Sequence, residues 1–157
     1  MRLMFLAWAL FSMTAMAGDR LPTMVEVTQL ESGMLCGDHE PGVRWIEDLQ
    51  QYQALTGVAA TESAYGELQE QQLLLVSMGQ RSSAGFYLAL AESQAQLQDG
   101  VIHLSLAWHS PAPGQMSAQM ITRPCLLVAL PRQAYQGVRV YDQHGELRHE
   151  HLLEVMP

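Results

Sequence analysis

The spacing of apolar residues changes character near residue 72. Residues 24–35 begin with the alternation of a strand and end in a Ser-Gly turn. Residues 40–57 show a helical period, with Pro41 near the start and Gly57 just past the end, and this predicts an amphipathic helix. Its apolar stripe consists of Trp45, Ile46, Leu49, Tyr52 and Leu55. Residues 58–72 are small and polar, which predicts a connection with about one helical turn.

From Leu73 onward the period is two, as expected of strands. The predicted strands are 73–78, 86–91, 101–109 and 125–131, followed by a hairpin that turns near Gly145. Alternating strand and helix patterns of a parallel sheet are absent. The sequence therefore predicts a mainly β (α+β) fold, an antiparallel β-sandwich or open barrel with one amphipathic helix packed on it.

The chain begins with an apparent targeting segment. A basic residue, an apolar run of secretory length and the sequence Ala15-Met16-Ala17 predict a signal peptide over residues 1–17. A buried N-terminal helix is the alternative. Residues 18–72 are then expected to supply a strand, helix and connection of the same domain whose β-rich core is 73–157. The predicted location is the periplasm or the extracellular space, with no membrane-spanning segment in the mature chain.

Charge and cysteine content narrow the classes of partner. Eight arginines and no lysine stand against 16 carboxylates, which gives a formal net charge of −8 and argues against a nucleic-acid partner. Cys36 and Cys125 are the two cysteines, and in an exported chain such a pair predicts a disulfide. Two separate buried thiols are the alternative.

The loop "GQRSSAGF" at 79–86 is the first candidate for chemistry. A catalytic Ser82 or Ser83, with His103 or His109 as base, lacks the strand-to-helix elbow that this chemistry uses, because a strand follows Gly85. A phosphate loop lacks its lysine. The glycines are better explained by a chain reversal that needs positive φ.

His149 and His151 raise the question of a metal site. In a strand over 147–152 they would share a face, with His144 and Glu150 near in sequence. No third ligand stands at a diagnostic spacing, so neither a metal nor a cofactor is predicted.

A second loop, residues 110–124, begins with Pro111, Pro113 and Gly114. The prolines stiffen the start of the loop, and a preset loop on a β scaffold loses little conformational entropy on binding. Met116 and Met120 add adaptable contact area. An ordinary strand connection is the competing interpretation.

These strands and loops, read together, resemble a known family. The segments "LLLVSMGQRSSAGFYLALAESQ" and "VIHLSLAWHSPAPGQMSAQMITRPCLLVALPR" are similar to the C-terminal domain of the protease-complex PrcB family, over about Leu73 to Arg132. The positions that fit the family pattern are Gly79, Gly85, Pro113, Gly114, Thr122, Pro124 and Pro131. The sequence departs from it at 81–86, where the family prefers Pro, Thr, Gly and Tyr.

The resemblance implies a non-catalytic subunit associated with a secreted bacterial protease. We therefore predict a non-enzymatic exported binding module with a protein partner, such as a protease complex. The candidate contact residues are Arg81, Ser82, Ser83, Ala84, Gly85, Phe86, Pro111, Pro113 and Gly114. Direct protease inhibition by the 80–86 loop and a structural envelope role are the alternatives; the sequence does not specify an oligomeric state.

Overall fold

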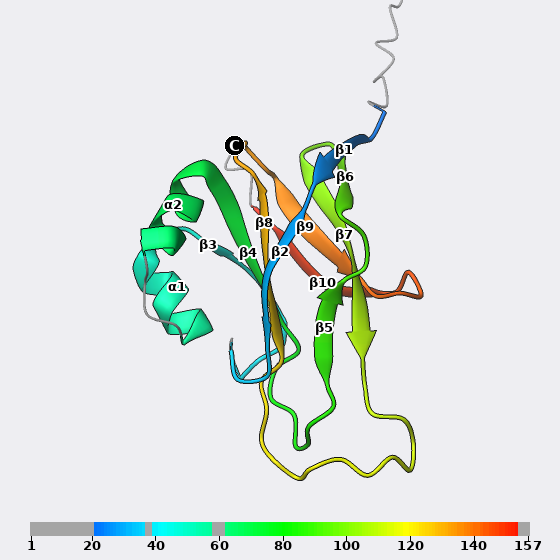
Figure 1. Ribbon diagram of the computed structural model, residues 1–157. Helices are drawn as coiled ribbons and strands as arrows, with labels where there is room; N and C mark the ends of the chain where they lie inside the picture. The colour runs from blue at the N-terminus through cyan, green and yellow to red at the C-terminus, as the bar shows by residue number, and fades with distance from the viewer. Residues whose placement is uncertain (1–20, 37–38, 58–61, 154–157) are drawn as a thin grey trace, which may run out of the picture.

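The computed structural model describes residues 21–36, 39–57 and 62–153, and the predicted signal peptide of residues 1–17 lies outside this range. Within it the chain forms two β-sheets packed face to face, with two helices against the outer face of one sheet (Figure 1). The predicted sandwich is confirmed, and neither sheet closes into a barrel. No helix in the described part of the chain is long and apolar enough to cross a membrane.

The first sheet has the strand order β1-β6-β7-β9-β10, and β5 pairs with the end of β7. Neighbours run antiparallel except β7 and β9, which are parallel. Its strands are β1 Thr23–Glu26, β5 Tyr87–Leu90, β6 Gln94–Gln98, β7 Val101–His109, β9 Gly137–Tyr141 and β10 Leu147–Leu152.

The second sheet has the order β2-β8-β4-β3 and is antiparallel throughout. Its strands are β2 Thr28–Gly33, β3 Gly42–Ile46, β4 Gln71–Ser77 and β8 Cys125–Pro131. A single buried residue, Val27, separates β1 from β2. The strand-like N-terminal segment therefore passes from one sheet to the other and forms two strands.

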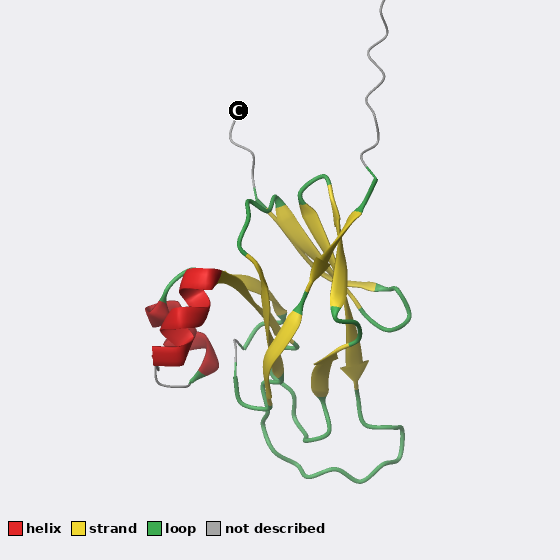
Figure 2. Cartoon of the chain, turned by 45° about the horizontal axis from the view of Figure 1, so that its top comes forward, coloured by secondary structure: helices red, strands yellow, loops and turns green. Residues whose placement is uncertain are grey.

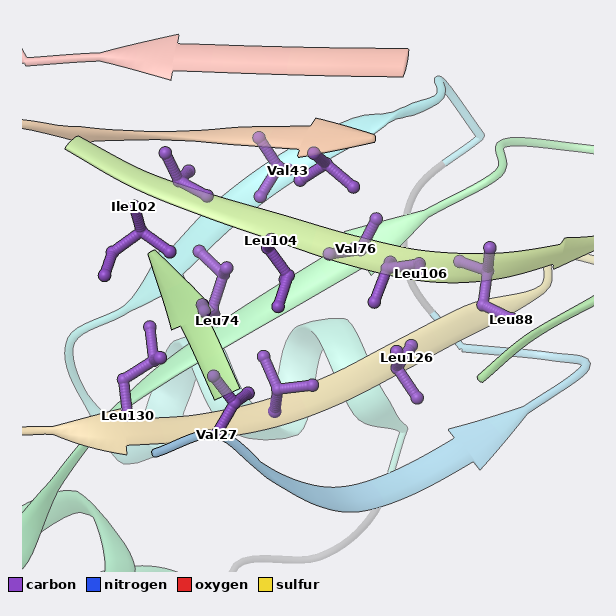
Figure 3. Close-up of a cluster of buried hydrophobic side chains, with 14 of the residues drawn as sticks. Val27, Val43, Leu74, Val76, Leu88, Ile102, Leu104, Leu106, Leu126 and Leu130 are labelled. Carbon is purple, nitrogen blue, oxygen red and sulfur yellow. The ribbon is translucent and has the colours of Figure 1, made fainter. Parts of the chain in front are cut away.

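The central strands β4 and β8 are apolar on both faces because each face packs on a different layer. Side chains of Leu74 and Leu126 point into the space between the sheets (Figure 3). Their neighbours Leu73 and Leu127 belong to a second cluster under the helices. Since successive strand residues face opposite ways, one apolar run serves both layers.

The helices α1 Leu49–Thr56 and α2 Glu62–Glu70 cover the second sheet, and Figure 2 shows both on the same side of the strands. The prediction of one helix over 40–57 is wrong in its first part, where β3 pairs with β4. The strand ends at Ile46, and Asp48 caps α1, accepting a hydrogen bond from the Gln51 backbone N at 2.8 Å. Gly57 terminates α1 in the left-handed conformation, as expected.

Two further elements differ from the sequence-based expectation. The stretch 58–72 contains the nine-residue helix α2, where about one turn was expected. The strand β6 was not predicted, because only Ala95 and Leu97 in it are apolar. The predicted strands 101–109 and 125–131 and the C-terminal hairpin are confirmed.

Cys36 and Cys125 are joined in a disulfide. Their Cα atoms lie 5.6 Å apart, and both residues are buried. The alternative of two separate thiols is wrong. The bond fixes the segment after β2 to the start of β8.

Candidate functional site

Both predicted loops cross between the sheets at the same end of the sandwich. Residues 78–86 connect β4 in the second sheet to β5 in the first, and residues 110–124 connect β7 in the first to β8 in the second. Because β4 neighbours β8 and β5 neighbours β7, the loops begin and end side by side (Figure 1). We call this end of the molecule the loop end.

Backbone hydrogen bonds join the two loops. The Arg81 backbone N donates to the Thr122 carbonyl oxygen at 2.8 Å, and the Thr122 backbone N donates back to Arg81 at 2.9 Å. The Ala84 backbone N donates to the Ala118 carbonyl oxygen at 2.9 Å. Buried Thr122 adds a side-chain bond, from Oγ1 to the Ser83 carbonyl oxygen at 3.1 Å. The loops are therefore braced against each other over several residues.

Gly85 and Pro111 form a close contact between the loops. Gly85 has φ +94, and a Cβ atom at this position would lie 2.9 Å from Pro111 Cγ. Both the backbone angle and the approach of the proline ring therefore require glycine. This contact joins two of the residues that the sequence singled out.

Pro113 and Gly114 form the turn at the start of the long loop. The Gln115 backbone N donates to the Ala112 carbonyl oxygen at 3.0 Å, and Gly114 has φ +80. No atom lies within 4 Å of a Cβ built on Gly114, so its glycine is required by conformation alone. Pro113 and Gly114 are exposed, whereas Pro111 is half-buried.

The candidate residues in the shorter loop differ in accessibility. The Arg81 guanidinium lies over the Phe86 ring, 5.4 Å from its centroid, and both side chains are half-buried. Arg81 Nε is buried and has no hydrogen-bond partner among the described residues. Ser82 and Gly85 are exposed, and Ser83 and Ala84 are half-buried. The middle of the loop, residues 82–85, thus consists of small residues, and it is flanked by the packed side chains of Arg81 and Phe86.

A third segment, which follows β2 and carries no loop motif of its own, also reaches this end. The Arg123 backbone N donates to the Met34 carbonyl oxygen at 2.7 Å, and Leu35 forms a parallel bridge with Arg123. The predicted disulfide is the sequence signal for this contact, because it joins Cys36, next to Leu35, to Cys125, two positions after Arg123.

The residues just before β3 support the shorter loop from the other side. The Gln80 backbone N donates to the His39 carbonyl oxygen at 2.8 Å, and the Gln80 and His39 side chains are 2.9 Å apart. Gly79 has φ +74, and a Cβ there would lie 2.7 Å from the Pro41 nitrogen. The start of this loop is therefore fixed by backbone packing.

The histidines considered as partners of a catalytic serine make other contacts. His103 Nδ1 lies 3.1 Å from the Tyr141 hydroxyl, and burial followed by the charge of Arg139 lowers the pKa of His103. His109 stacks on Tyr87 with ring centroids 3.9 Å apart. Each of the two imidazole rings therefore stacks on a tyrosine of a neighbouring strand in the first sheet.

The histidines of the final hairpin lie in different surroundings. His149 is half-buried beside Trp108, and burial, with the charges of Arg148 and Arg81, lowers its pKa despite a hydrogen bond to the Ser77 backbone. His151 is exposed. Among the described residues, no group of three or more His, Cys, Asp or Glu side chains is placed to hold a metal ion.

A groove of about 770 Å³ lies beside β3, α1 and β10, and its lining includes Pro41, which packs against Gly79 at the start of the shorter loop. Its lining also includes Trp45, Leu55 and Glu150. None of the predicted contact residues lines this groove.

The strand and loop pattern of the loop end can now be compared with known proteins. Residues 73–131 match the family model described as PrcB C-terminal. The resemblance seen in the sequence is confirmed over this segment, which is less than half of the chain. The PrcB C-terminal segment runs from β4 to the end of β8 and contains both loops whole. No curated protein and no solved structure matches the chain.

Proposed function

We propose that this protein is an exported, non-enzymatic binding module that associates with a protein partner, a protease complex, through its loop end. One observation carries the proposal: the segment that matches the PrcB C-terminal family contains both loops, and these loops pack into a single surface. The contact residues proposed are those of 81–86 together with Pro111, Pro113 and Gly114. The signal-like N-terminus and the disulfide support export.

The rigidity of the loop end supports recognition of a protein. Backbone hydrogen bonds and the Gly85–Pro111 contact fix the loops before any partner arrives. Association then costs little conformational entropy in these loops, so more of the contact energy is retained as affinity. The protein therefore has the preorganisation expected of a subunit that docks through loops on a β scaffold.

Direct inhibition of a protease by residues 80–86 is the less favoured function. An inhibitory loop has to enter an active-site cleft, but this loop is braced by residues 118–122 of the longer loop. A partner that contacts residues 80–86 therefore meets the longer loop as well, which suits docking beside an active site better than insertion of a single loop into one. Assays against a panel of serine and cysteine proteases separate these functions, since only inhibition predicts loss of peptide cleavage.

Photo-crosslinking tests the docking surface. A photoreactive amino acid at Ser82 or Ala112 is expected to capture a protease subunit from the exported proteins of the native source. The same group at Ala134, an exposed position in the connection at the opposite end of β8, is the matched control. Equal capture from all three positions, or recovery of a free monomer without crosslinked partner, contradicts the proposal.

A further inference from the structure

Exposed apolar side chains are concentrated at the loop end. Among the described residues, 11 large apolar side chains are exposed, and six of them belong to this end. These six are Met34, Leu35, Tyr87, Met116, Met120 and Ile121. Single exposed apolar residues are ordinary, but their concentration at one end of a molecule is typical of an interaction surface.

Leu35 and Ile121 come from different segments and lie on one side. Leu35 pairs with Arg123 in a parallel bridge, and paired residues direct their side chains to the same face. Ile121 precedes Arg123 by two positions and so shares that face, while Thr122 between them is buried. Leu35 is 62% exposed and Ile121 is 64% exposed. We call Leu35, Ile121 and Arg123 the ridge.

The disulfide holds the two halves of the ridge together. Cys36 directly follows Leu35, and Cys125 lies two positions after Arg123. The hydrogen bond from the Arg123 backbone N to Met34 adds a second link. The ridge is therefore fixed in place although its side chains are exposed to solvent.

The two loops carry a charge opposite to that of the chain. Residues 33–36, 78–86 and 110–124 contain two arginines, Arg81 and Arg123, and no carboxylate, and Glu40 is the exposed carboxylate beside the start of the shorter loop, between His39 and Pro41. The whole chain has a net charge of −8. A partner with carboxylates at its contact surface would be repelled by most faces of this protein and attracted by the loop end, which favours one orientation of docking.

We propose that Leu35 and Ile121 of the ridge insert into an apolar pocket of the protein partner, and that Arg123 of the ridge pairs with carboxylates at the rim of this pocket. This inference rests on the proposed function and specifies the chemistry of the partner. It also adds Leu35, which lies outside the family match, to the binding surface.

A protein pocket fits these residues better than the other surfaces that an apolar ridge could contact. The net charge of −8 would repel this protein from an anionic membrane, and the two arginines of the loop end are too few to outweigh that repulsion. In a symmetric contact through the same surface of a second copy, Arg123 would need a carboxylate in the two loops of that copy, and residues 78–86 and 110–124 contain none. Methionines such as Met34 and Met120 adapt to irregular protein surfaces.

Substitutions in the ridge test this inference. Each variant carries the photoreactive amino acid at Ser82, and the yield of crosslinked partner is measured in the exported proteins of the native source. Leu35→Ser and Ile121→Ser are each expected to reduce the yield of crosslinked partner about tenfold at limiting protein, because a buried apolar contact is lost. Arg123→Glu is expected to reduce it more than Arg123→Gln. Leu21→Ser, which removes a leucine that is 88% exposed and precedes β1 at the opposite end, is the matched control.

The outcomes separate this inference from the proposed function. Failure of the unsubstituted protein to crosslink a partner overturns the proposed function. Normal crosslinking by the unsubstituted protein that persists in Leu35→Ser and Ile121→Ser overturns the ridge alone. The ridge proposal also fails if these substitutions instead abolish binding to vesicles of phosphatidylglycerol and phosphatidylcholine, or self-association in sedimentation. Unchanged circular dichroism and melting temperatures are expected, since both side chains are exposed.

Discussion

Replacement of both Cys36 and Cys125 by alanine removes a cross-link between residues separated by 89 positions. In the chain-entropy description, a loop of this length lowers the entropy of the unfolded chain by about 15 cal/mol/K, which corresponds to about 4.6 kcal/mol at about 25 °C. Domains of this size are stable by about 5–15 kcal/mol in total. The double variant is therefore expected to lose a third or more of its free energy of unfolding.

Urea unfolding measures this loss. Trp45, which stacks on Tyr135, and Trp108 provide fluorescence signals from the two sheets. With a slope near 2 kcal/mol/M, typical of small domains, the unfolding midpoint should fall by about 2 M urea. The unsubstituted protein in reductant should unfold at nearly the same midpoint as the double variant. If the variant folds too weakly for a full transition, the oxidised protein and the variant are compared in a stabilising osmolyte such as TMAO, which strengthens both folded states.

A stability difference below about 1 kcal/mol between oxidised and double-variant protein would refute the reasoning. It would mean that the unfolded chain is already restricted to a similar degree without the cross-link. Hydrogen exchange adds a local measurement. Amides at 34–35 and 121–123 should lose more protection than those in the hairpin of β9 and β10, because the disulfide holds the segment of Leu35 against the longer loop.

Three further predictions concern a loop contact, the core and a buried imidazole. Gly85→Ala should destabilise the protein by about 1–3 kcal/mol more than Gly114→Ala in urea unfolding, because the cost of a positive φ is common to both positions and only Gly85 would also overlap a proline ring. Leu74→Ala should cost about 2–5 kcal/mol in the same assay, since its side chain is fully buried between the sheets, and a cost below 1 kcal/mol would contradict that packing. Burial lowers the pKa of His149, so the folded state binds a proton less readily than the unfolded chain. The contribution of this group to stability should be complete above about pH 6.5 and should decrease as the pH falls below that value. In unfolding curves, His149→Gln should reduce this pH dependence, whereas His151→Gln, at an exposed position, should not.

The regions predicted correctly are those in which the local sequence alone shows which side chains are buried. In β7, Ile102, Leu104 and Leu106 alternate with half-buried residues, and this period is visible without knowing any neighbour. The segment 42–46 was misassigned because Trp45 and Ile46 are compatible with both periods. Pairing with β4 across the sheet decides in favour of a strand, and this partner is distant in sequence.

The candidate site shows the same division. Glycine and proline marked the loops as turns, but the contact of Gly85 with Pro111 depends on β4 pairing with β8 and β5 with β7. Strand order follows from the packing of the whole chain and is not encoded in any one loop. The position of Leu35 has a different cause. Leu35 carries no turn or motif signal of its own, and in the sequence only the cysteine beside it connects it with the longer loop.

The family match and the sheet topology divide the second sheet and the loop end between two parts of the chain. The matched segment supplies β4 and β8, the two inner strands of the second sheet, and both loops. The segment before the match adds the outer strands β2 and β3. Leu35, which follows β2, lies beside Arg123 in the ridge. The pairing of β2 with β8 thus has two effects: it covers a strand edge, and it places an apolar side chain beside the long loop. If docking depends on the ridge, then the preference for one partner is set partly by residues outside the matched segment. Exchange of Met34 and Leu35, which spares Gly33 and the disulfide residue Cys36, should then alter partner choice while leaving the sandwich intact.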